Sequence, residues 1–417
     1  MKKSVVESDV LVIGGGPAGL ICAIEAARGG RQVIILEAQS QPGLKLLATG
    51  GGRCNLTNTL EPDEMARRFP EHQMLIGSTL RTFPPESLRH WFQELNVQTH
   101  APDGFHVFPR THRAATVRDA LLQEARRLRV QFVLNCKVHR LEKGEKFLVE
   151  GGAGEQFAAT TVLVACGGVG YPELGDGSGM WEILKALGHT VSPPVPAMVP
   201  LITKERWPGQ CRSDTLPKVE LSVAGSRSRG TVGDLIFTRK GIAGPVVLDA
   251  SREIAALLHT QGAVPVRIRL REGWTQEPWR ELFLKELEAN PTTLVESWLT
   301  DHVSPALART AVELLGIPQR TPLARLPRNL RSSLTEWLGG IPLTVVGTEG
   351  IRHAMVTRGG VTLREVDPLT FESRLIPGLH FAGEVLDVDG PCGGYNLQWA
   401  FSTGYVAGTL FSHLALD

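Results

Sequence analysis

The chain has 417 residues, of which 42% are hydrophobic and 21% charged, as in an ordinary globular protein of two or three domains. Lysine plus arginine total 44 and aspartate plus glutamate 43, so the net charge of +1 gives no global argument for a nucleic-acid or membrane partner. The apolar run 10–13 ends in glycines, and no segment approaches the roughly 20 apolar residues of a spanning helix, so we expect a cytoplasmic protein without a signal peptide.

The first elements in chain order predict a βαβ unit. Residues 9–13 have the pattern of a short buried strand, 18–28 have small and apolar residues at helical spacing, and 33–36 form the next apolar strand. A glycine-rich turn joins the first strand to the helix. Strand, glycine turn, helix and strand within about 30 residues are typical of a mononucleotide-binding half.

The later elements predict that one domain is assembled from both ends of the chain. Helices are expected over 87–95, 115–128 and 177–187, and strands over 130–141 and 161–165. A proline-rich stretch at 192–196 indicates a domain boundary. Strand-like segments at 219–223 and 264–270 follow, then a mainly helical region at 279–338, and finally a strand at 378–382 and a helix at 396–410.

The glycine turn carries the dinucleotide-binding pattern G-x-G-x-x-G. Gly14 allows the tight turn, Gly16 lets a pyrophosphate approach the backbone, and Gly19 lets the helix pack closely on the strand. The helix that opens at Pro17 and Ala18 offers free N–H groups to the phosphates. Glu37 ends the second strand, 37 − 14 = 23 positions after the first glycine, where an acid accepts bonds from the adenosine ribose and repels the 2′-phosphate of NADP.

Three further segments favour FAD over NAD. The stretch 43–55 is glycine-rich and holds Lys45 and Arg53, the strand 161–165 ends in Cys166-Gly167-Gly168, and Gly383 and Gly394 precede a helix. The N-terminus of that helix can stabilise negative charge on a reduced flavin, and Glu384 can accept from the ribityl hydroxyls. The sequence has no second G-x-G-x-x-G after a strand, so NAD(P)H would have to visit the flavin transiently.

Two segments are long enough to indicate a family. Residues 43–58 (GLKLLATGGGRCNLTN) and 383–400 (GEVLDVDGPCGGYNLQWA) closely resemble the signatures of the aminoacetone oxidase-like family of bacterial FAD-binding enzymes, which also contains bile-acid enone reductases. The resemblance extends over essentially the whole chain. It implies an α/β fold in which a three-layer Rossmann-type FAD-binding domain with a parallel central sheet, residues 1–191 and 344–417, is interrupted by an inserted domain, 192–343, that is β-rich and then helical.

The resemblance also extends the set of expected cofactor contacts. It adds Val138, whose backbone would meet adenine. Together with the residues above, the expected contacts are Gly14, Gly16, Pro17, Ala18, Gly19, Glu37, Lys45, Gly51, Gly52, Arg53, Cys54, Asn55, Val138, Cys166, Gly167, Gly168, Gly383, Glu384, Gly394, Tyr395, Asn396 and Leu397.

Neither the catalytic acid or base nor the oligomeric state follows from the sequence. The segment 235–245 matches a family segment that usually has histidine where this chain has Arg239. A guanidinium stays protonated and is a poor acid, so Arg239 is either an anchor for an anionic substrate or a solvated loop residue.

The sequence predicts an FAD-dependent oxidoreductase that acts on a small molecule. This enzyme either reduces an activated unsaturated substrate or oxidises an amine. Reduction of uracil in RNA, an activity that the family resemblance implies for some members, is the less favoured alternative. Its supporting feature is the segment 319–331, which holds Arg320, Arg325, Arg328 and Arg331 without an acid. A non-catalytic flavin-binding protein is a third interpretation.

The cysteines predict free thiols and no metal site. The six are scattered without a C-x-x-C pair, and no histidine cluster has metal-ligand spacing. Cys54 and Cys392 both lie in segments expected near the flavin, so a redox dithiol is a hypothesis that the sequence does not favour.

Overall fold

The computed structural model describes residues 5–69, 71–226 and 230–413, which form two compact units. The first unit contains residues 1–195 and 356–417, and the second contains residues 196–355. The boundaries predicted from the sequence are 191/192 and 343/344. The chain leaves the first unit within strand β12 (Val191–Ala197) and returns to it just before β19 (Val356–Val361), and these two strands pair.

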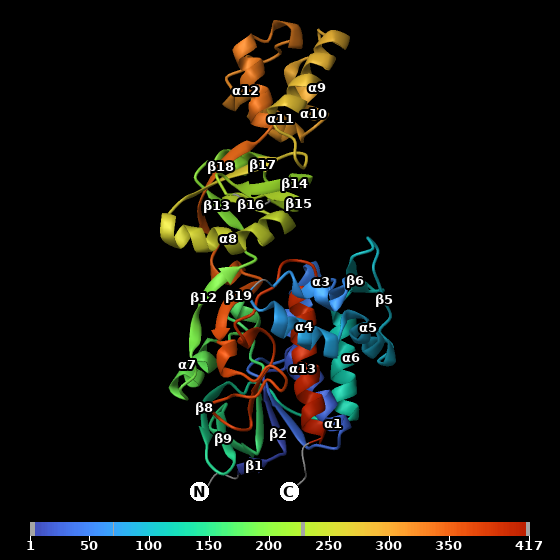
Figure 1. The fold of residues 1–417 in the computed structure, drawn as a ribbon, viewed down its shortest axis with the longest axis vertical. Coiled ribbons are helices and arrows are strands. Elements are labelled where there is room, and N and C mark those ends of the chain that lie inside the picture. Colours follow the sequence, from blue (N-terminus) through green and yellow to red (C-terminus); the bar gives the residue numbers. More distant parts are fainter. Residues whose placement is uncertain (1–4, 70, 227–229, 414–417) are drawn as a thin grey trace. The chain divides into compact units, whose positions relative to one another are not determined.

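A parallel sheet with the strand order β20-β11-β2-β3-β7 forms the centre of the first unit (Figure 1). The bounds of these strands are Leu379–Phe381, Thr161–Val164, Val10–Ile13, Val33–Leu36 and Gln131–Val133. All pairs in this sheet are parallel. Strands that are buried on both faces give uninterrupted apolar runs, which is why β2 and β3 were recognisable in the sequence.

Two layers cover this sheet, and alternate residues of its strands face one or the other. Val10 and Val12 pack with helices α1 (Pro17–Arg28), α6 (Ala114–Arg127) and α13 (Tyr395–His413). Leu11 and Ile13 pack with a second sheet of order β1-β10-β9-β8, whose strands are Val5–Glu7, Glu155–Ala159, Phe147–Gly151 and Val138–Lys143. The three-layer α/β fold built from both chain ends is therefore confirmed.

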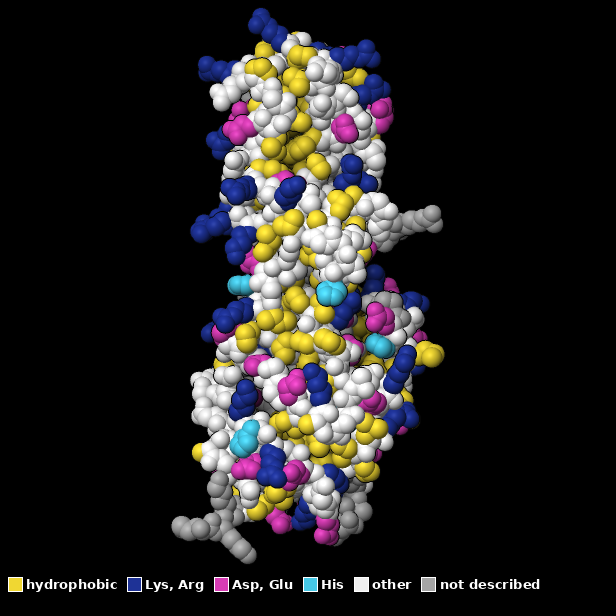
Figure 2. Space-filling view, turned by 90° about the vertical axis from the view of Figure 1, so that its left-hand side faces the viewer, with side chains coloured by type: hydrophobic (Ala, Val, Ile, Leu, Met, Phe, Trp, Pro, Cys, Tyr) yellow, Lys and Arg dark blue, Asp and Glu magenta, His cyan; other side chains and the backbone are white. Residues whose placement is uncertain are grey.

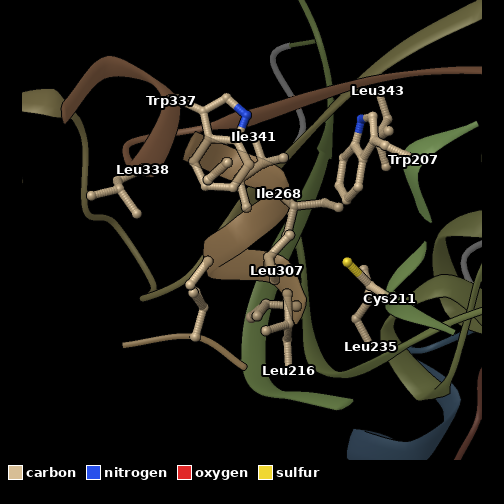
Figure 3. Packing of buried hydrophobic residues seen from close by; sticks show 14 of the residues in the cluster. Trp207, Cys211, Leu216, Leu235, Ile268, Leu307, Trp337, Leu338, Ile341 and Leu343 are labelled. Atoms are coloured by element: carbon tan, nitrogen blue, oxygen red, sulfur yellow. The ribbon is translucent and has the colours of Figure 1, made fainter. Parts of the chain in front are cut away.

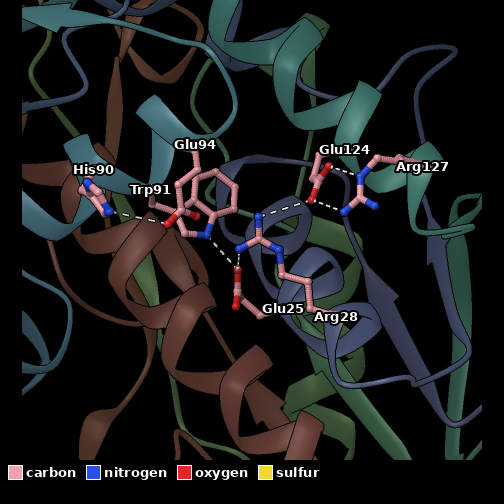
Figure 4. A network of polar contacts seen from close by, with 7 residues as sticks. All are labelled: Glu25, Arg28, His90, Trp91, Glu94, Glu124 and Arg127. Carbon is pink, nitrogen blue, oxygen red and sulfur yellow. Dashed lines mark hydrogen bonds and ion pairs between the residues drawn. The ribbon is translucent and has the colours of Figure 1, made fainter.

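A network of hydrogen bonds and ion pairs links the helices of this layer to one another (Figure 4). The Glu25 carboxylate of α1 accepts from Trp91 Nε1 at 2.7 Å, and Trp91 lies on helix α5 (Pro85–Glu94). Arg28 bridges Glu25, at 2.9 Å, to Glu124 of α6, at 3.3 Å. Burial raises the pKa of Glu25, whereas the hydrogen bonds from Arg127 lower the pKa of Glu124. Because each carboxylate has a guanidinium partner, the network fixes the packing of α1 against α5 and α6.

Small helices and a short antiparallel sheet complete the first unit. The sheet has the order β4-β6-β5, with strands Thr57–Asn58, His106–Pro109 and Thr99–His100. The helices are α2 (Leu44–Ala48), α3 (Pro62–Ala66), α4 (Gln73–Thr82) and α7 (Ser178–Ala186). Helix α2 occupies part of the glycine-rich stretch 43–55, for which the sequence predicts no helix.

The second unit is a closed barrel with helices inserted between its strands in chain order, so the expected β-rich and then helical insert ends in a further barrel strand. The barrel order is β13-β16-β15-β14-β17-β18, with strands Leu201–Thr203, Gly241–Ala243, Thr231–Phe237, Thr215–Val223, Val264–Arg269 and Ile341–Thr348. The helices are α8 (Pro245–Gln261), α9 (Gln276–Ala289), α10 (Val295–Thr300), α11 (Pro305–Leu314) and α12 (Arg328–Leu338). Figure 3 shows the common core, in which Trp207 and Cys211 lie with barrel residues such as Ile268 and helical residues such as Leu307.

We expect the stability of the protein to depend on pH through His302, a half-buried residue of the helical part whose ring nitrogens are buried. Both ring nitrogens of His302 are buried without a hydrogen-bond partner among the described residues, between the rings of Trp279 and Trp298. Burial, and then the charge of Arg271, lower the pKa of His302. The unfolded chain therefore binds the extra proton more readily, and stability falls as the pH drops below the unfolded value of about 6.5.

We expect His302→Phe to flatten this dependence. Urea unfolding of wild type and variant at several pH values between 5 and 8 would measure it, followed by tryptophan fluorescence. Identical pH slopes for the two proteins would contradict the assignment.

None of the helices in the described residues is long and apolar enough to cross a membrane.

Candidate functional site

The glycine turn between β2 and α1 has the geometry that the sequence predicts. Gly14 has φ +107°, and a Cβ there would lie 2.4 Å from the Ala165 carbonyl oxygen at the end of β11. A Cβ on Gly19 would lie 2.0 Å from the Gly14 oxygen, so a side chain at either position would push the elements apart. A Cβ on Gly16 would meet nothing within 4 Å, which leaves open space beside the backbone.

The N-terminus of α1 faces this space without a side-chain cap. Gly16 is the N-cap and makes no capping hydrogen bond, and Pro17 occupies the first helical position. The first-turn amides of a helix have no intrahelical partner, and the helix dipole adds positive potential there. A diphosphate fits both features, because it supplies acceptor oxygens and negative charge.

Glu37 lies at the end of β3, beside the same turn. Its Oε2 accepts from the Gly15 amide at 2.7 Å, and its Oε1 from the Gln39 amide at 2.8 Å. Burial raises the pKa of Glu37, although these amide bonds oppose the shift. Each carboxylate oxygen has two acceptor sites, so the carboxylate can still accept from a ligand hydroxyl. The amide of Cys136 donates to the Glu37 carbonyl at 2.9 Å, which brings the segment leading to Val138 next to this acid.

The stretch 43–55 reaches the end of β11 through Lys45, whose Nζ donates to the Gly168 carbonyl at 3.0 Å. Gly50, Gly51 and Gly52 have φ values of +56°, +65° and +84°, and a Cβ on Gly51 would meet nothing within 4 Å. The exposed Arg53 stacks over Phe108 of β6, with its guanidinium carbon 5.1 Å from the ring centroid. The loop 50–55 therefore exposes backbone without side chains at its glycines, together with one cation, Arg53.

The two signature segments, more than 300 positions apart, meet in space. Asn58 Nδ2 donates to the Gly393 carbonyl at 2.8 Å. In the orientation that satisfies its hydrogen bonds, the Asn55 amide donates to Thr57 O and accepts from the Gly394 amide at 3.1 Å. A Cβ on Gly394 would lie 2.5 Å from the Thr57 backbone, so glycine alone permits the approach.

Glu384 is tied to the end of β11 through a residue that sequence reasoning missed. Its Oε1 accepts from the Thr357 amide at 2.8 Å, and Thr357 Oγ1 accepts from the amides of Val169 and Gly170 at 2.9 and 3.0 Å. A Cβ on Gly168 would lie 2.5 Å from Glu384 Oε1. Thr357 lies on β19, directly after the insert, and no motif marks it.

The segment that precedes α13 lies against the start of α1 at Gly383, whereas the first side chains of α13 make contacts elsewhere. A Cβ on Gly383 would lie 3.1 Å from that of Ala18. Tyr395 is buried and packs edge-on against Phe69, at a centroid distance of 5.9 Å. The Asn396 side chain closes the loop before the helix through two bonds to the Gly390 backbone, at 2.7 and 2.9 Å. The expected contacts at Tyr395, Asn396 and Leu397 would therefore involve the backbone.

Two cysteines of the site, Cys54 and Cys166, have raised thiol pKa values. Burial raises the pKa of Cys54 to about 12, and the pKa of Cys166 also to about 12. Both are free thiols. Because the thiolate is the reactive form, these shifts disfavour thiol chemistry at neutral pH.

We expect iodoacetamide at pH 8 to leave Cys54 and Cys166 unmodified in the folded protein and to modify both after denaturation. Peptide mass spectrometry would measure this. Rapid modification of Cys54 in the folded state would contradict the assigned burial and would revive the dithiol hypothesis.

Within the described residues, no group of three or more His, Cys, Asp or Glu side chains is arranged to hold a metal ion.

The arginines that the sequence singles out in the second unit differ in their exposure and in their hydrogen bonds. Arg239 is exposed in the tight turn between β15 and β16. Arg320, Arg325 and Arg328 are exposed, whereas Arg331 donates to the backbone carbonyls of Leu326, at 2.7 Å, and Ala324, at 3.3 Å. Arg331 is thus an internal structural residue. On the face shown in Figure 2, Lys and Arg side chains are interspersed with Asp and Glu.

Known proteins match this chain over nearly its whole length. Residues 8–410 match the family described as HI0933-like protein Rossmann domain. The 3-dehydro-bile acid delta(4,6)-reductase of Clostridium scindens is 36% identical over 401 residues, which cover 95% of this chain and 97% of that protein. The ribosomal RNA dihydrouridine synthase of Escherichia coli is 31% identical over 409 residues, covering 95% and 96%.

A solved structure supports the fold. The 3-ketosteroid-delta4-(5alpha)-dehydrogenase of Rhodococcus jostii, in complex with 4-androstene-3,17-dione, has a TM-score of 0.53 at 16% identity and covers 99% of this chain and 98% of its own. The chain therefore belongs to the HI0933-like FAD-binding Rossmann family, and it is an FAD-dependent oxidoreductase.

Proposed function

We propose that the protein reduces a carbon–carbon double bond conjugated to a carbonyl group in a small apolar molecule. The observation that carries the proposal is the similarity, over nearly the whole of both chains, to an enzyme named for reducing unsaturated 3-dehydro bile acids. Such a bond is electron-poor at the carbon β to the carbonyl, so it accepts a hydride there. Bound FAD supplies that hydride chemistry.

We propose that FAD is held by the residues brought together above. The amides at the start of α1 would bind the diphosphate, Glu37 the adenosine ribose, and the segment entering β8 at Val138 the adenine. The isoalloxazine would lie among the bare-backbone stretches 50–55, 166–168 and 393–397. Backbone amides at the start of α13 would stabilise negative charge on the reduced ring, since a helix N-terminus favours an anion.

The electron donor in this proposal is NADH or NADPH, which visits the open flavin face. Anaerobic stopped-flow of the FAD-loaded protein with each nicotinamide should show bleaching of the flavin absorbance. Mixing the reduced protein with a 3-oxo-4-ene steroid acid should restore the yellow colour and yield the saturated ketone. Bleaching by an amine but by neither nicotinamide would replace this proposal with amine oxidation.

Reduction of uracil in RNA is a second candidate, favoured by the similarity to a ribosomal RNA dihydrouridine synthase. The uracil double bond is also conjugated to a carbonyl, so the chemistry is the same. The exposed Arg320, Arg325 and Arg328 would contact phosphates. Incubation of the reduced protein with ribosomal RNA, followed by nucleoside mass spectrometry, would show dihydrouridine. A mobility shift that weakens steeply with salt would accompany it.

A further inference from the structure

An aspartate–histidine pair lies on the hairpin formed by β5 and β6. Asp103 Oδ2 is 2.5 Å from His106 Nδ1, and Asp103 Oδ1 accepts from the backbone amides of Phe105 and His106 at 3.0 and 2.8 Å. Within residues 5–69, 71–226 and 230–413, Nε2 of His106 has no hydrogen-bond partner. The His106 side chain is 37% exposed, so a ligand can reach that nitrogen.

The aspartate is ionised throughout the physiological range. Partial burial acts against ionisation, but the hydrogen bonds from the His106 ring and from the two amides lower the pKa of Asp103 to about 2. An ionised carboxylate at Nδ1 accepts the proton there and fixes the tautomer. Nε2 is then the atom that takes up and releases the second proton.

One side of the pair adjoins the turn that enters α13. His106 is directly opposite Asn58 in the β4–β6 register, so the two side chains lie on the same face of the sheet. Asn58 donates to the Gly393 carbonyl at 2.8 Å. A Cβ on Gly393 would lie 3.2 Å from the ring of Phe105.

The other side adjoins the loop 50–55. Phe108 is two positions beyond His106, so its side chain is on the same face, and the two ring centroids are 6.3 Å apart. Arg53 stacks over Phe108, and a Cβ on Gly50 would lie 3.6 Å from that ring. The pair therefore lies between the two glycine-rich stretches that we assign to the isoalloxazine.

We propose that His106 is the proton donor of the reduction and that Asp103 is the residue that positions it; this rests on the proposed function. In the reaction the π bond of the substrate breaks. Reduced FAD, when bound, would supply the hydride and its two electrons for a C–H bond at the β carbon. A proton from His106 Nε2 forms the C–H bond at the α carbon. The products are the saturated ketone and oxidised FAD; the imidazole regains its proton from water, and a nicotinamide reduces FAD again.

This assignment supplies the acid that Arg239 cannot provide, since a guanidinium does not release its proton near neutral pH.

The kinetic test compares His106→Asn with a matched control, His90→Asn. The asparagine amide can still donate to Asp103 but carries no acidic proton at the position of Nε2. His90 is an exposed histidine on α5, and its Nε2 is 3.5 Å from Glu94 Oε1. Each FAD-loaded protein is reduced anaerobically and mixed with a cyclic enone or with a nitroalkene of similar ring size. The nitroalkene yields a stable nitronate anion, so its reduction needs no proton donor.

We expect His106→Asn to slow reoxidation by the enone about 100-fold or more, the range for loss of a general acid. Reoxidation by the nitroalkene and flavin reduction by the nicotinamide should keep their wild-type rates. Asp103→Asn should slow the enone step by roughly 10-fold, as expected for loss of a residue that orients an imidazole. His90→Asn should match the wild type in every step. Unchanged enone rates in His106→Asn, or an equal loss with both substrates, would overturn the inference.

A second readout does not depend on turnover. In protein labelled with ¹⁵N-histidine, the NMR shifts of neutral His106 should identify the Nδ1–H tautomer in the wild type. In the Asp103→Asn variant, these NMR shifts should move towards the values of the Nε2–H tautomer. Identical shifts in the two proteins would overturn the role of Asp103. If the wild type itself reduces neither an enone nor uracil, the proposed function falls, and the inference falls with it. If the wild type reduces an enone and His106→Asn does so equally well, only the inference falls.

Discussion

Gly16→Ala is expected to weaken FAD binding by about 100-fold, or ~2.7 kcal/mol, without unfolding the protein. Gly16 has φ −79° and ψ −175°, a conformation that alanine adopts readily, and the added methyl group would meet no protein atom within 4 Å. The methyl group would instead occupy the space that we assign to the diphosphate. Calorimetric titration of the flavin-free protein with FAD would measure the loss, and thermal unfolding without FAD would verify the fold.

Gly347→Ala is the matched control for this experiment. Gly347 lies on β18 of the second unit, and a Cβ there also meets nothing within 4 Å. This variant should bind FAD as the wild type does. Wild-type affinity in Gly16→Ala would mean that the diphosphate lies elsewhere.

Gly404→Ala is expected to destabilise the protein by about 3 kcal/mol. A Cβ on Gly404 of α13 would lie 2.3 Å from the Ala18 carbonyl oxygen and 2.6 Å from the Ile21 side chain. Alanine normally stabilises a helix relative to glycine by about 1 kcal/mol, so the clash must exceed this gain. Because Ala18 is in the first turn of α1, separating the two helices would also displace the amides that we assign to the cofactor. Urea unfolding measured by circular dichroism would give the difference.

A second helical glycine provides the control. A Cβ on Gly179 of α7 would lie 3.3 Å from the end of the flexible Lys137 side chain, which can move. Gly179→Ala should therefore be neutral or stabilise the protein by roughly 0.5–1 kcal/mol. If both variants were equally stable, close packing of α1 on α13 would not be a source of stability.

The sequence predicted the central sheet and the first glycine turn well, for a physical reason. Strands buried on both faces read as apolar runs. Gly14 has φ +107°, and a Cβ on Gly19 would lie 2.0 Å from the Gly14 carbonyl oxygen, so the turn itself requires these two glycines. Helices α5, α6, α7 and α13 were also recognisable, because their apolar residues recur at helical spacing.

The remaining features depend on contacts between distant parts of the chain. Residues 192–196 looked like a stiff linker because of their prolines, yet they form β12, which pairs with β19 after the insert. Helix α8 escaped prediction because it is rich in β-branched and small residues that also suit strands. Thr357 and His106 carry no local pattern at all. Their surroundings arise only when β19 and the β5–β6 hairpin pack beside the glycine-rich stretches.

The meeting of residues 55–58 with residues 393–394 has a consequence for biosynthesis. A ribosome that has completed the first strand, turn and helix has made the assigned diphosphate site but has not yet made the peptide that completes the isoalloxazine site. The ribosome must synthesise the whole insert, residues 196–355, before that final segment exists. If the flavin binds where we assign it, its complete site would exist only when translation is nearly finished.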